Sequence, residues 1–316
     1  MLFFSKYESA IFLFHRIHPI RDSMWDPIDP ILFEQCLSYI SKHFFTTSLN
    51  EVIENKSVYG TKPMAAITFD DGYRDFIDYS LPVLDKYKFK TSIFLTTGCI
   101  DNNLPVWTYV MDYLFFNTHK VELKFFDTSN LPLAFQQTKW KNKIDRIEYG
   151  KKLKQHLKYI NASLRNEIIE KVNYNFSDVV LPSGLMMSWL DIINIHEYGV
   201  QIGSHSATHP TLDTLESDKE ITFELKESAG RILKMTGIKA EIFSYPNGSY
   251  NKRVMKLTQK AGYKYALAVN KKPYHFSRED DFSISRIELY NENWIKTKAR
   301  IDGSISFTKK MIKLLK

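Results

Sequence analysis

Two short segments carry side chains whose types and spacing suit metal-dependent chemistry. They are TFDDG at residues 68–72 and GSHSATHP at residues 203–210, and each leaves an apolar run typical of a buried strand. Adjacent carboxylates at such a position are costly unless a cation compensates them. Two histidines four residues apart can face one side of a helical turn and bind one ion. The alternatives are an Asp-Gly turn before a helix and two structural histidines.

One carboxylate and two imidazoles would give a single ion three protein ligands. We predict that Asp71, His205 and His209 bind a divalent metal, with zinc favoured over other transition metals, and leave positions open for water. Asp70 could then accept the proton of the attacking water as a general base. A zincin would need Glu directly after the first histidine, where Ser206 stands. A non-haem iron oxygenase could use the same ligand types but has no evident use for the second aspartate.

Strand-like and helix-like segments alternate along most of the chain, which predicts a parallel α/β sheet or barrel. Sites in such folds lie at the C-terminal ends of the strands, where both motifs fall. The expected strands are Ala10–Phe14, Ala65–Phe69, Thr91–Thr97, Val200–Ser204, Glu241–Tyr245, Tyr265–Val269 and Phe282–Leu289. The expected helices are Ile31–Phe45, Tyr73–Tyr87, Ser188–Tyr198, Ser217–Met235 and Asn251–Ala261, the fourth with a capping box formed by Ser217 and Glu220.

The alternation stops between residues 101 and 182, where lysine-rich helical segments are expected at Ile144–Ile160 and Ala162–Phe176. We predict a helical insertion there, acting as a lid or specificity element, on a core formed by residues 1–100 and 183–316. A packing element without chemistry is the alternative. The tail Phe307–Lys316 is basic and amphipathic. It could contact a membrane surface or dock on the core.

Composition narrows the partners. The chain has 43 basic and 36 acidic residues, a net charge of +7, but no basic block within a recognisable nucleic-acid module. We therefore expect no nucleic-acid partner. The apolar N-terminus is interrupted by charges, and no run reaches the roughly 20 apolar residues of a membrane span. These features predict a cytoplasmic protein, at the inner face of the membrane if the tail binds there.

The two motifs, in this order and spacing, resemble those of the polysaccharide deacetylase family, also called NodB-homology or carbohydrate esterase family four. The resemblance extends over residues 10–289 and implies a distorted (β/α)7 barrel. It also implies Asp70 as base and Asp71, His205 and His209 as metal ligands. The segment FSYPNG, residues 243–248, resembles the family's third motif. A simple Pro-Asn-Gly turn is the alternative for this segment. Its resemblance implies a substrate groove lined by Tyr245, Pro246 and Asn247, with the Asn247 backbone N–H as oxyanion donor.

The chain departs from the family pattern in two places. Ser244 stands where many members carry an arginine that orients the base; Arg286 is the candidate replacement, unless it is a surface residue. The C-terminal Leu-x-His motif that supplies a general acid is missing, and His275 is the last histidine. However, FHR at residues 14–16 resembles the Tyr-His of poly-N-acetylglucosamine deacetylases, whose barrel is circularly permuted. That likeness implies His15 as the acid, with a packed strand-end histidine as the alternative.

Together these features predict a hydrolase that removes the N-acetyl group from an amino sugar. The expected substrate is a glycan or a lipid- or nucleotide-linked glycan precursor in the synthesis of capsule, lipopolysaccharide or another cell-surface polysaccharide. An esterase that removes O-acetyl groups would use the same site. A non-catalytic glycan-binding homologue is the remaining alternative.

Overall fold

The strands of the protein form one largely parallel sheet. A computed structural model describes residues 2–5, 8–54, 62–123, 131–136, 139–306 and 308. The strands are β1 (Glu8–Phe14), β2 (Phe45–Thr46), β3 (Met64–Phe69), β4 (Thr91–Leu95), β5 (Gln201–Ser204), β6 (Ile242–Ser244), β7 (Tyr265–Ala268), β8 (Tyr274–His275), β9 (Ile284–Ser285) and β10 (Ile287–Glu288). All seven predicted strands are present, and sequence analysis missed the two-residue strands β2 and β8.

The sheet closes almost completely on itself. Its order is β10-β1-β3-β4-β5-β6-β7-β9, with every neighbouring pair on this path parallel. The strands β9 and β10 are two halves of one predicted strand, separated by Arg286: the first half pairs with β7 and the second with β1. The strands therefore enclose a seven-stranded barrel, which confirms the predicted fold class.

Alternation along the strands separates the barrel interior from the layer of helices. On β3, Ala65 and Ile67 pack with the apolar residues of α1 and α8, whereas Met64 and Ala66 pack with Phe94 and other interior residues. Since successive side chains of a strand point to opposite faces, Asp70 continues the interior set beyond the end of β3. By the same alternation, Ser244 follows the interior residue Ile242 on β6, and Arg286 follows the interior residue Ile284 on β9, so both face the barrel interior. The polar side chains of Asp70, Ser244 and Arg286 therefore lie at the C-terminal ends of the strands, next to the apolar residues that fill the rest of the barrel interior.

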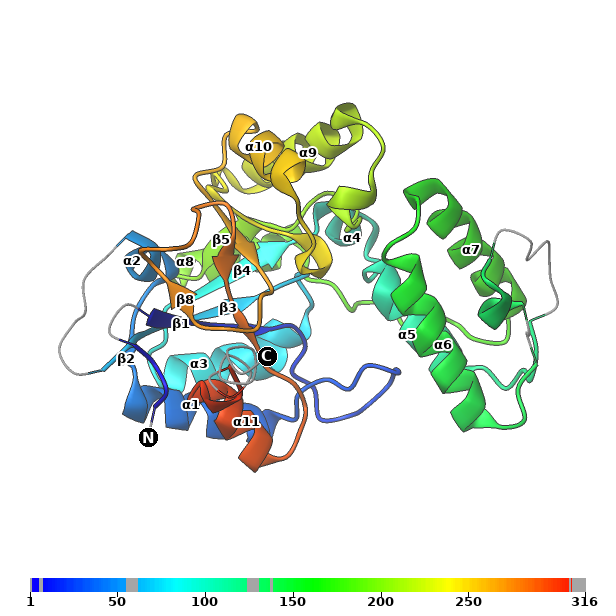
Figure 1. Cartoon of the computed structure of the whole chain (residues 1–316), viewed down its shortest axis with the longest axis horizontal. Coiled ribbons are helices and arrows are strands. Elements are labelled where there is room, and N and C mark those ends of the chain that lie inside the picture. Colours follow the sequence, from blue (N-terminus) through cyan, green and yellow to red (C-terminus); the bar gives the residue numbers. More distant parts are fainter. Residues whose placement is uncertain are drawn as a thin grey trace.

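Helices cover the outside of the barrel (Figure 1). They are α1 (Pro30–His43), α2 (Leu49–Glu54), α3 (Leu81–Lys86), α4 (Thr97–Asn102), α5 (Trp107–Asn117), α6 (Lys143–Leu157), α7 (Ala162–Asn175), α8 (Trp189–Glu197), α9 (Asp218–Thr236), α10 (Lys252–Lys260) and α11 (Trp294–Ile301). Helices α1, α3 and α11 lie on one side, and α9 and α10 on the opposite side (Figure 1). The predicted capping box at Ser217 and Glu220 starts α9, and Gly237 ends that helix at a φ of 74°.

Helices α5, α6 and α7 lie beside the barrel and share a hydrophobic cluster of their own (Figure 1). Gly150 on α6 permits a close approach, because a Cβ there would lie 2.6 Å from the ring of Phe115 on α5. The loop after β1 reaches this group: Asn117 donates to the Asp22 carbonyl, and the Met24 amide donates to the Asp112 carbonyl. The predicted division into core and insertion stays a prediction.

No helix in the described ranges has the length and apolar character needed to cross a membrane. The basic tail Phe307–Lys316 lies outside the described residues apart from Thr308. Its proposed membrane contact is therefore still a prediction.

Two glycines test the packing of the barrel. Gly203 lies opposite Phe94 across β5 and β4, and a Cβ there would come within 2.4 Å of the Phe94 ring. We expect Gly203→Ala to lower the free energy of unfolding by about 1–3 kcal/mol through overpacking. Gly230 is exposed on α9, and a Cβ added there would have no atom within 4 Å. Gly230→Ala should therefore raise the free energy of unfolding by about 0.5–1 kcal/mol. Urea unfolding measures both, and equal effects would contradict this packing.

Candidate active site

A cavity of about 450 Å³ opens at the C-terminal ends of the barrel strands. Sequence-predicted residues from four separate segments line it: His15, Asp70, Asp71, His205, His209, Tyr245 and Asn247. Cavities of about 300–1,000 Å³ are typical of small-molecule sites. The fold thus brings together most of the side chains singled out from the sequence.

The predicted metal ligands converge on one point. Oδ1 of Asp71 lies 3.4 Å from Nε2 of His205 and 3.4 Å from Nε2 of His209. One donor atom from each of the three residues lies within 4.8 Å of the others, and all three residues are buried. Asp71 adopts a φ of 76°, in the left-handed region that aspartate tolerates better than most residues.

The histidine segment is a loop and not the helical turn expected from the spacing. Ser206 and His209 have φ values of 68° and 60°, which an α-helix does not contain. Glu224 on α9 holds the loop: its carboxylate accepts from the amides of Ala207 and Thr208 at 2.9 and 2.8 Å. The histidine rings converge through this backbone path and not through helical periodicity.

The two imidazoles differ in their electrostatic state. Nδ1 of His205 lies 2.8 Å from the Ser244 carbonyl, which can only accept, so Nδ1 carries the hydrogen and Nε2 faces Asp71. Burial lowers the pKa of His209 to about 3, so its ring is neutral at pH 7. For His205, the nearby carboxylates outweigh burial and raise the pKa. A proton and a metal ion would therefore compete for the Nε2 lone pair of His205.

Asp70 is held by a buried arginine. Nη1 and Nη2 of Arg286 donate to its two carboxylate oxygens at 2.8 and 2.7 Å, and Ser244 donates to Oδ2 at 3.0 Å. Nη2 of Arg286 also donates to the Ser244 hydroxyl at 2.7 Å. Burial opposes ionisation of Asp70, but Arg286 and His205 outweigh it and lower the pKa of this carboxyl. Because the Arg286 side chain is 0% exposed, the surface alternative is wrong.

His15 follows β1 and lines the cavity beside Trp25, with ring centroids 4.9 Å apart in an edge-on arrangement. Its Nδ1 is buried and has no hydrogen-bond partner in the structure. The next residue, Arg16, fixes the chain: its Nε donates to Asp75 at 2.7 Å, and its Nη1 lies 3.2 Å from Asp22. Burial raises the pKa of Asp75 to about 7, although Arg16 acts in the opposite direction. The strand-end histidine thus faces the cavity from an anchored backbone.

The third motif borders the same cavity. Tyr245 and Asn247 line it, whereas the buried Pro246 between them starts a short turn that redirects the chain. Asn247 has a φ of 57°, and its side-chain amide donates to Thr211 at 3.1 Å. The oxyanion role of the Asn247 backbone N–H stays a prediction.

His275 does not join the site. It pairs with Glu8 at the start of β1, whereas His15 follows the end of that strand. The two ends of the seven-residue strand β1 are six steps of about 3.3 Å apart, which makes roughly 20 Å. The short strand β8, which sequence analysis missed, therefore carries His275 to the far end of the barrel.

Sequence analysis did not assign several of the residues that border the cavity. Helices α5 and α6 contribute Thr108, Asp112, Lys154 and Gln155, and the chain just after α6 adds Lys158 and Tyr159. The lysine-rich composition of this region was visible, but no local pattern showed which side of the helix meets the barrel. No sequence pattern identified Glu224 either, because its role depends on a contact between α9 and the loop that carries Ala207 and Thr208, 16–17 residues earlier in the chain.

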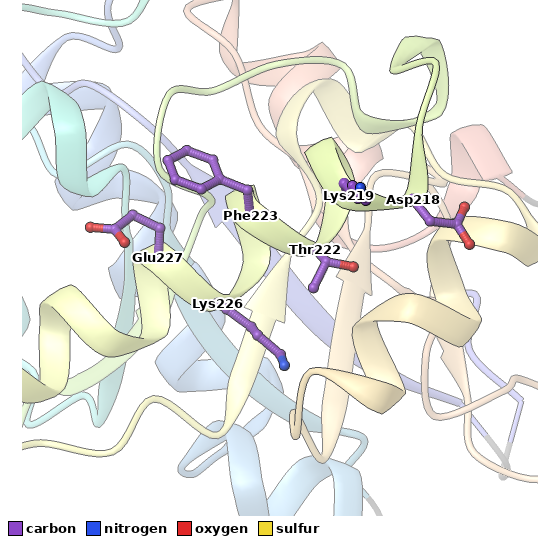
Figure 2. Close-up of a pocket in the computed structure, with 6 residues that line it drawn as sticks. All are labelled: Asp218, Lys219, Thr222, Phe223, Lys226 and Glu227. Atoms are coloured by element: carbon purple, nitrogen blue, oxygen red, sulfur yellow. The ribbon is translucent and has the colours of Figure 1, made fainter.

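A second hollow, on the exposed side of α9, has a different character (Figure 2). All the residues that line it come from this one helix: Asp218, Lys219, Thr222, Phe223, Lys226 and Glu227. None of them belongs to the predicted ligand set. The residues predicted to bind the metal and to act as base and acid all line the barrel cavity instead.

The donor set fits a divalent metal ion. Oδ1 of Asp71 is buried without a hydrogen-bond partner, although two imidazole nitrogens face it at 3.4 Å. A cation at their centre would satisfy an otherwise unpaired buried carboxylate oxygen. One carboxylate and two imidazoles form a ligand set typical of catalytic zinc, and other transition metals accept the same donors.

Comparison with known proteins agrees with this architecture. The sequence model of a family described as polysaccharide deacetylase matches residues 57–266, more than half of the 316-residue chain. The chain therefore belongs to the polysaccharide deacetylase family. Membership supports a hydrolase that deacetylates glycans, and the family is generally metal-dependent. No curated protein matches the chain significantly.

Solved structures share the fold at low identity. The Streptococcus pyogenes deacetylase PplD in complex with acetate is 17% identical, with a TM-score of 0.59, and the match covers 93% of this chain and 99% of that chain. A de-N-acetylase from Aggregatibacter actinomycetemcomitans is 14% identical, with a TM-score of 0.59 and coverage of 93% and 99%. IcaB from Ammonifex degensii is 14% identical, with a TM-score of 0.58 and coverage of 94% and 97%.

The Arg286–Asp70 pair predicts a large stability effect. Arg286→Met should lower the free energy of unfolding by about 3–5 kcal/mol, because it leaves a buried carboxylate without its cation. As a control, Arg231→Met removes a partly exposed pair with Asp101 and should cost less than about 1 kcal/mol. Adding Asp70→Asn to Arg286→Met should recover part of the loss. Urea unfolding of wild type, the two single arginine variants and the double variant measures these changes. Similar losses in the two single arginine variants would refute the buried-pair argument.

Proposed function

We propose that this protein is a metal-dependent deacetylase that hydrolyses the N-acetyl group of an amino sugar. The observation that carries the proposal is the convergence of Asp71, His205 and His209 beside a second buried carboxylate, Asp70, in one cavity. Membership of the polysaccharide deacetylase family supports the removal of acetyl groups from glycans. The N-acetyl specificity, the metal requirement and the sugar are our proposal.

Each catalytic role is assigned to a residue of the cavity. A divalent ion bound by Asp71, His205 and His209 would acidify water and polarise the acetyl carbonyl. Asp70 accepts the proton of the attacking water, with Arg286 and Ser244 fixing its carboxylate plane. His15, which follows β1 next to the β3 end that carries Asp70, donates a proton to the departing amine, and the Asn247 backbone N–H stabilises the oxyanion.

The proposed substrates are glycans or lipid- or nucleotide-linked glycan precursors of cell-surface polysaccharides. Lysines in the cavity wall support a substrate with phosphate or carboxylate groups. A cytoplasmic location, at the inner face of the membrane, is proposed with such a precursor and stays a prediction. Paired N- and O-acetylated sugars in an acetate-release assay separate amide hydrolysis from ester hydrolysis. Acetate release from neither would favour a glycan-binding protein.

The two aspartates should separate metal binding from proton transfer. Asp70→Asn should retain nearly stoichiometric zinc after dialysis while acetate release falls by about 10²–10⁴-fold, because only the base is lost. Asp71→Asn should lose the metal as well, since a ligand is removed. Metal analysis and acetate assays on the same samples provide the test. Loss of metal with retained turnover in Asp70→Asn would reverse the two assignments.

His15 should affect the chemical step and not substrate binding. His15→Ala should lower kcat by about 10²–10⁴-fold with little change in KM, because the lost proton donor acts only in the transition state. His18 provides a control in the same loop: its Nδ1 contacts the Ile20 backbone, and it is not among the cavity residues. His18→Ala should keep normal turnover. Unchanged kcat in His15→Ala would exclude it as the acid.

A further inference from the structure

Three lysines line the cavity without a role in the proposed hydrolysis. Lys154 lies on α6, Lys158 follows one turn later at the end of that helix, and Lys271 follows β7. Lys154 donates to Asp112 at 2.6 Å, and Lys271 lies 3.3 Å from Glu288. The carboxylates in this part of the cavity therefore each have a lysine partner.

Lys158 differs from the other two. Among the residues that the structure describes, Nζ of Lys158 has no hydrogen-bond acceptor and no carboxylate oxygen within 4.0 Å. Its side chain is half-buried. Burial and the charge of Lys154 lower the pKa of Lys158, whereas Glu288 and Asp112 act in the opposite direction. A partly desolvated ammonium group without a partner is unfavourable unless an anion joins it.

Among the charged residues that the structure describes around the cavity, Lys158 is the one cation in this part of the structure that is not paired with a carboxylate. Arg286 offsets Asp70, Lys154 offsets Asp112 and Lys271 offsets Glu288. Asp71 already faces the two imidazoles of the proposed metal site. The site is thus prepared for one additional negative charge.

We propose that Lys158 binds an anionic group of the substrate, a carboxylate or a phosphate carried by the acetylated sugar or its neighbour. The inference rests on the proposed function and deepens it by naming the substrate class: an acidic glycan or a phosphate-linked sugar. Lys158 acts as a specificity-determining residue, placed by α6 in the same cavity as Asp70 and the proposed metal ligands.

The test compares neutral and anionic substrates with the zinc-loaded full chain. The neutral substrate is N,N′-diacetylchitobiose. The anionic ones are a glucuronyl–N-acetylglucosamine disaccharide and N-acetylglucosamine 1-phosphate, which distinguish a carboxylate from a phosphate. The variants are Lys158→Gln, the charge-retaining Lys158→Arg, and Lys152→Gln as a matched control on an exposed position of α6 that does not line the cavity. Acetate release gives kcat and KM for each pair.

We expect Lys158→Gln to lower kcat/KM on one anionic substrate by about 10- to 100-fold, mainly through KM, because a charge-assisted hydrogen bond is lost. Turnover of the neutral disaccharide should stay within about twofold, Lys158→Arg should retain most of the preference, and Lys152→Gln should behave as wild type. Equal losses on neutral and anionic substrates would assign Lys158 to the chemical step and overturn the proposal.

A binding measurement keeps this inference separate from the proposed function. Isothermal titration of the three sugars into Asp70→Asn protein, with and without Lys158→Gln, reads recognition without turnover. If wild-type protein releases no acetate from any sugar, the proposed function fails. Tighter binding of an anionic sugar that disappears in Lys158→Gln would still support Lys158. Equal affinities for the neutral and both anionic sugars would overturn it in either case.

Discussion

Two neighbouring carboxylates inside the barrel are the constraint on which the rest of the site depends. Asp70 and Asp71 are each almost fully buried, and a buried anion is stable only beside a compensating cation. Asp70 is paired with the guanidinium group of Arg286, a cation that belongs to the chain itself. Asp71 is faced by two imidazoles, which contact one of its oxygens. The two aspartates are therefore compensated in different ways, and this difference supports the proposed roles of Asp70 as base and Asp71 as metal ligand.

The arginine pair also limits how strong a base Asp70 can be. The guanidinium that stabilises the charged carboxylate lowers its pKa and engages both of its oxygens. Such a carboxylate removes a proton effectively only from water that is itself acidic, and a zinc ion brings the pKa of bound water to about 7. The lowered pKa of Asp70 therefore agrees with the proposed cation at the neighbouring Asp71, His205 and His209.

Ser244 stands where many family members carry the arginine that orients the base, and here Arg286 forms the ion pair with Asp70 instead. Arg286 sits at the break between β9 and β10, where the last strand leaves β7 and joins β1. Its side chain points inward across the barrel and fills the space beside a small residue, and the Ser244 hydroxyl links it to Asp70. A large side chain at position 244 would compete for that volume. The small serine and the distant arginine are two parts of one arrangement.

Sequence patterns predicted the strands, the α/β barrel and the grouping of Asp71, His205 and His209, because strand periodicity and short motifs are local properties. Asp70 and Asp71 could be placed at a strand end from the residues around them. The path of the His205–His209 loop could not be predicted, because Glu224 on a separate helix holds it and positive φ values replace the expected helical turn. Strand β8 has only two residues, too few for a periodic signal, so the position of His275 was missed.

The same limit explains why no individual residue of the helices beside the barrel was assigned to the site, although a lid or specificity element was predicted there. Trp107, the first residue of α5, donates its indole N–H to the His209 carbonyl at 3.0 Å, so this helix holds the backbone of a predicted ligand. Helix α6 packs on α5 and presents Lys154 to the cavity. Because one helical pair both contacts the loop that carries His209 and lines the cavity, a change in α5–α6 packing would alter the cavity wall and the position of this predicted ligand together.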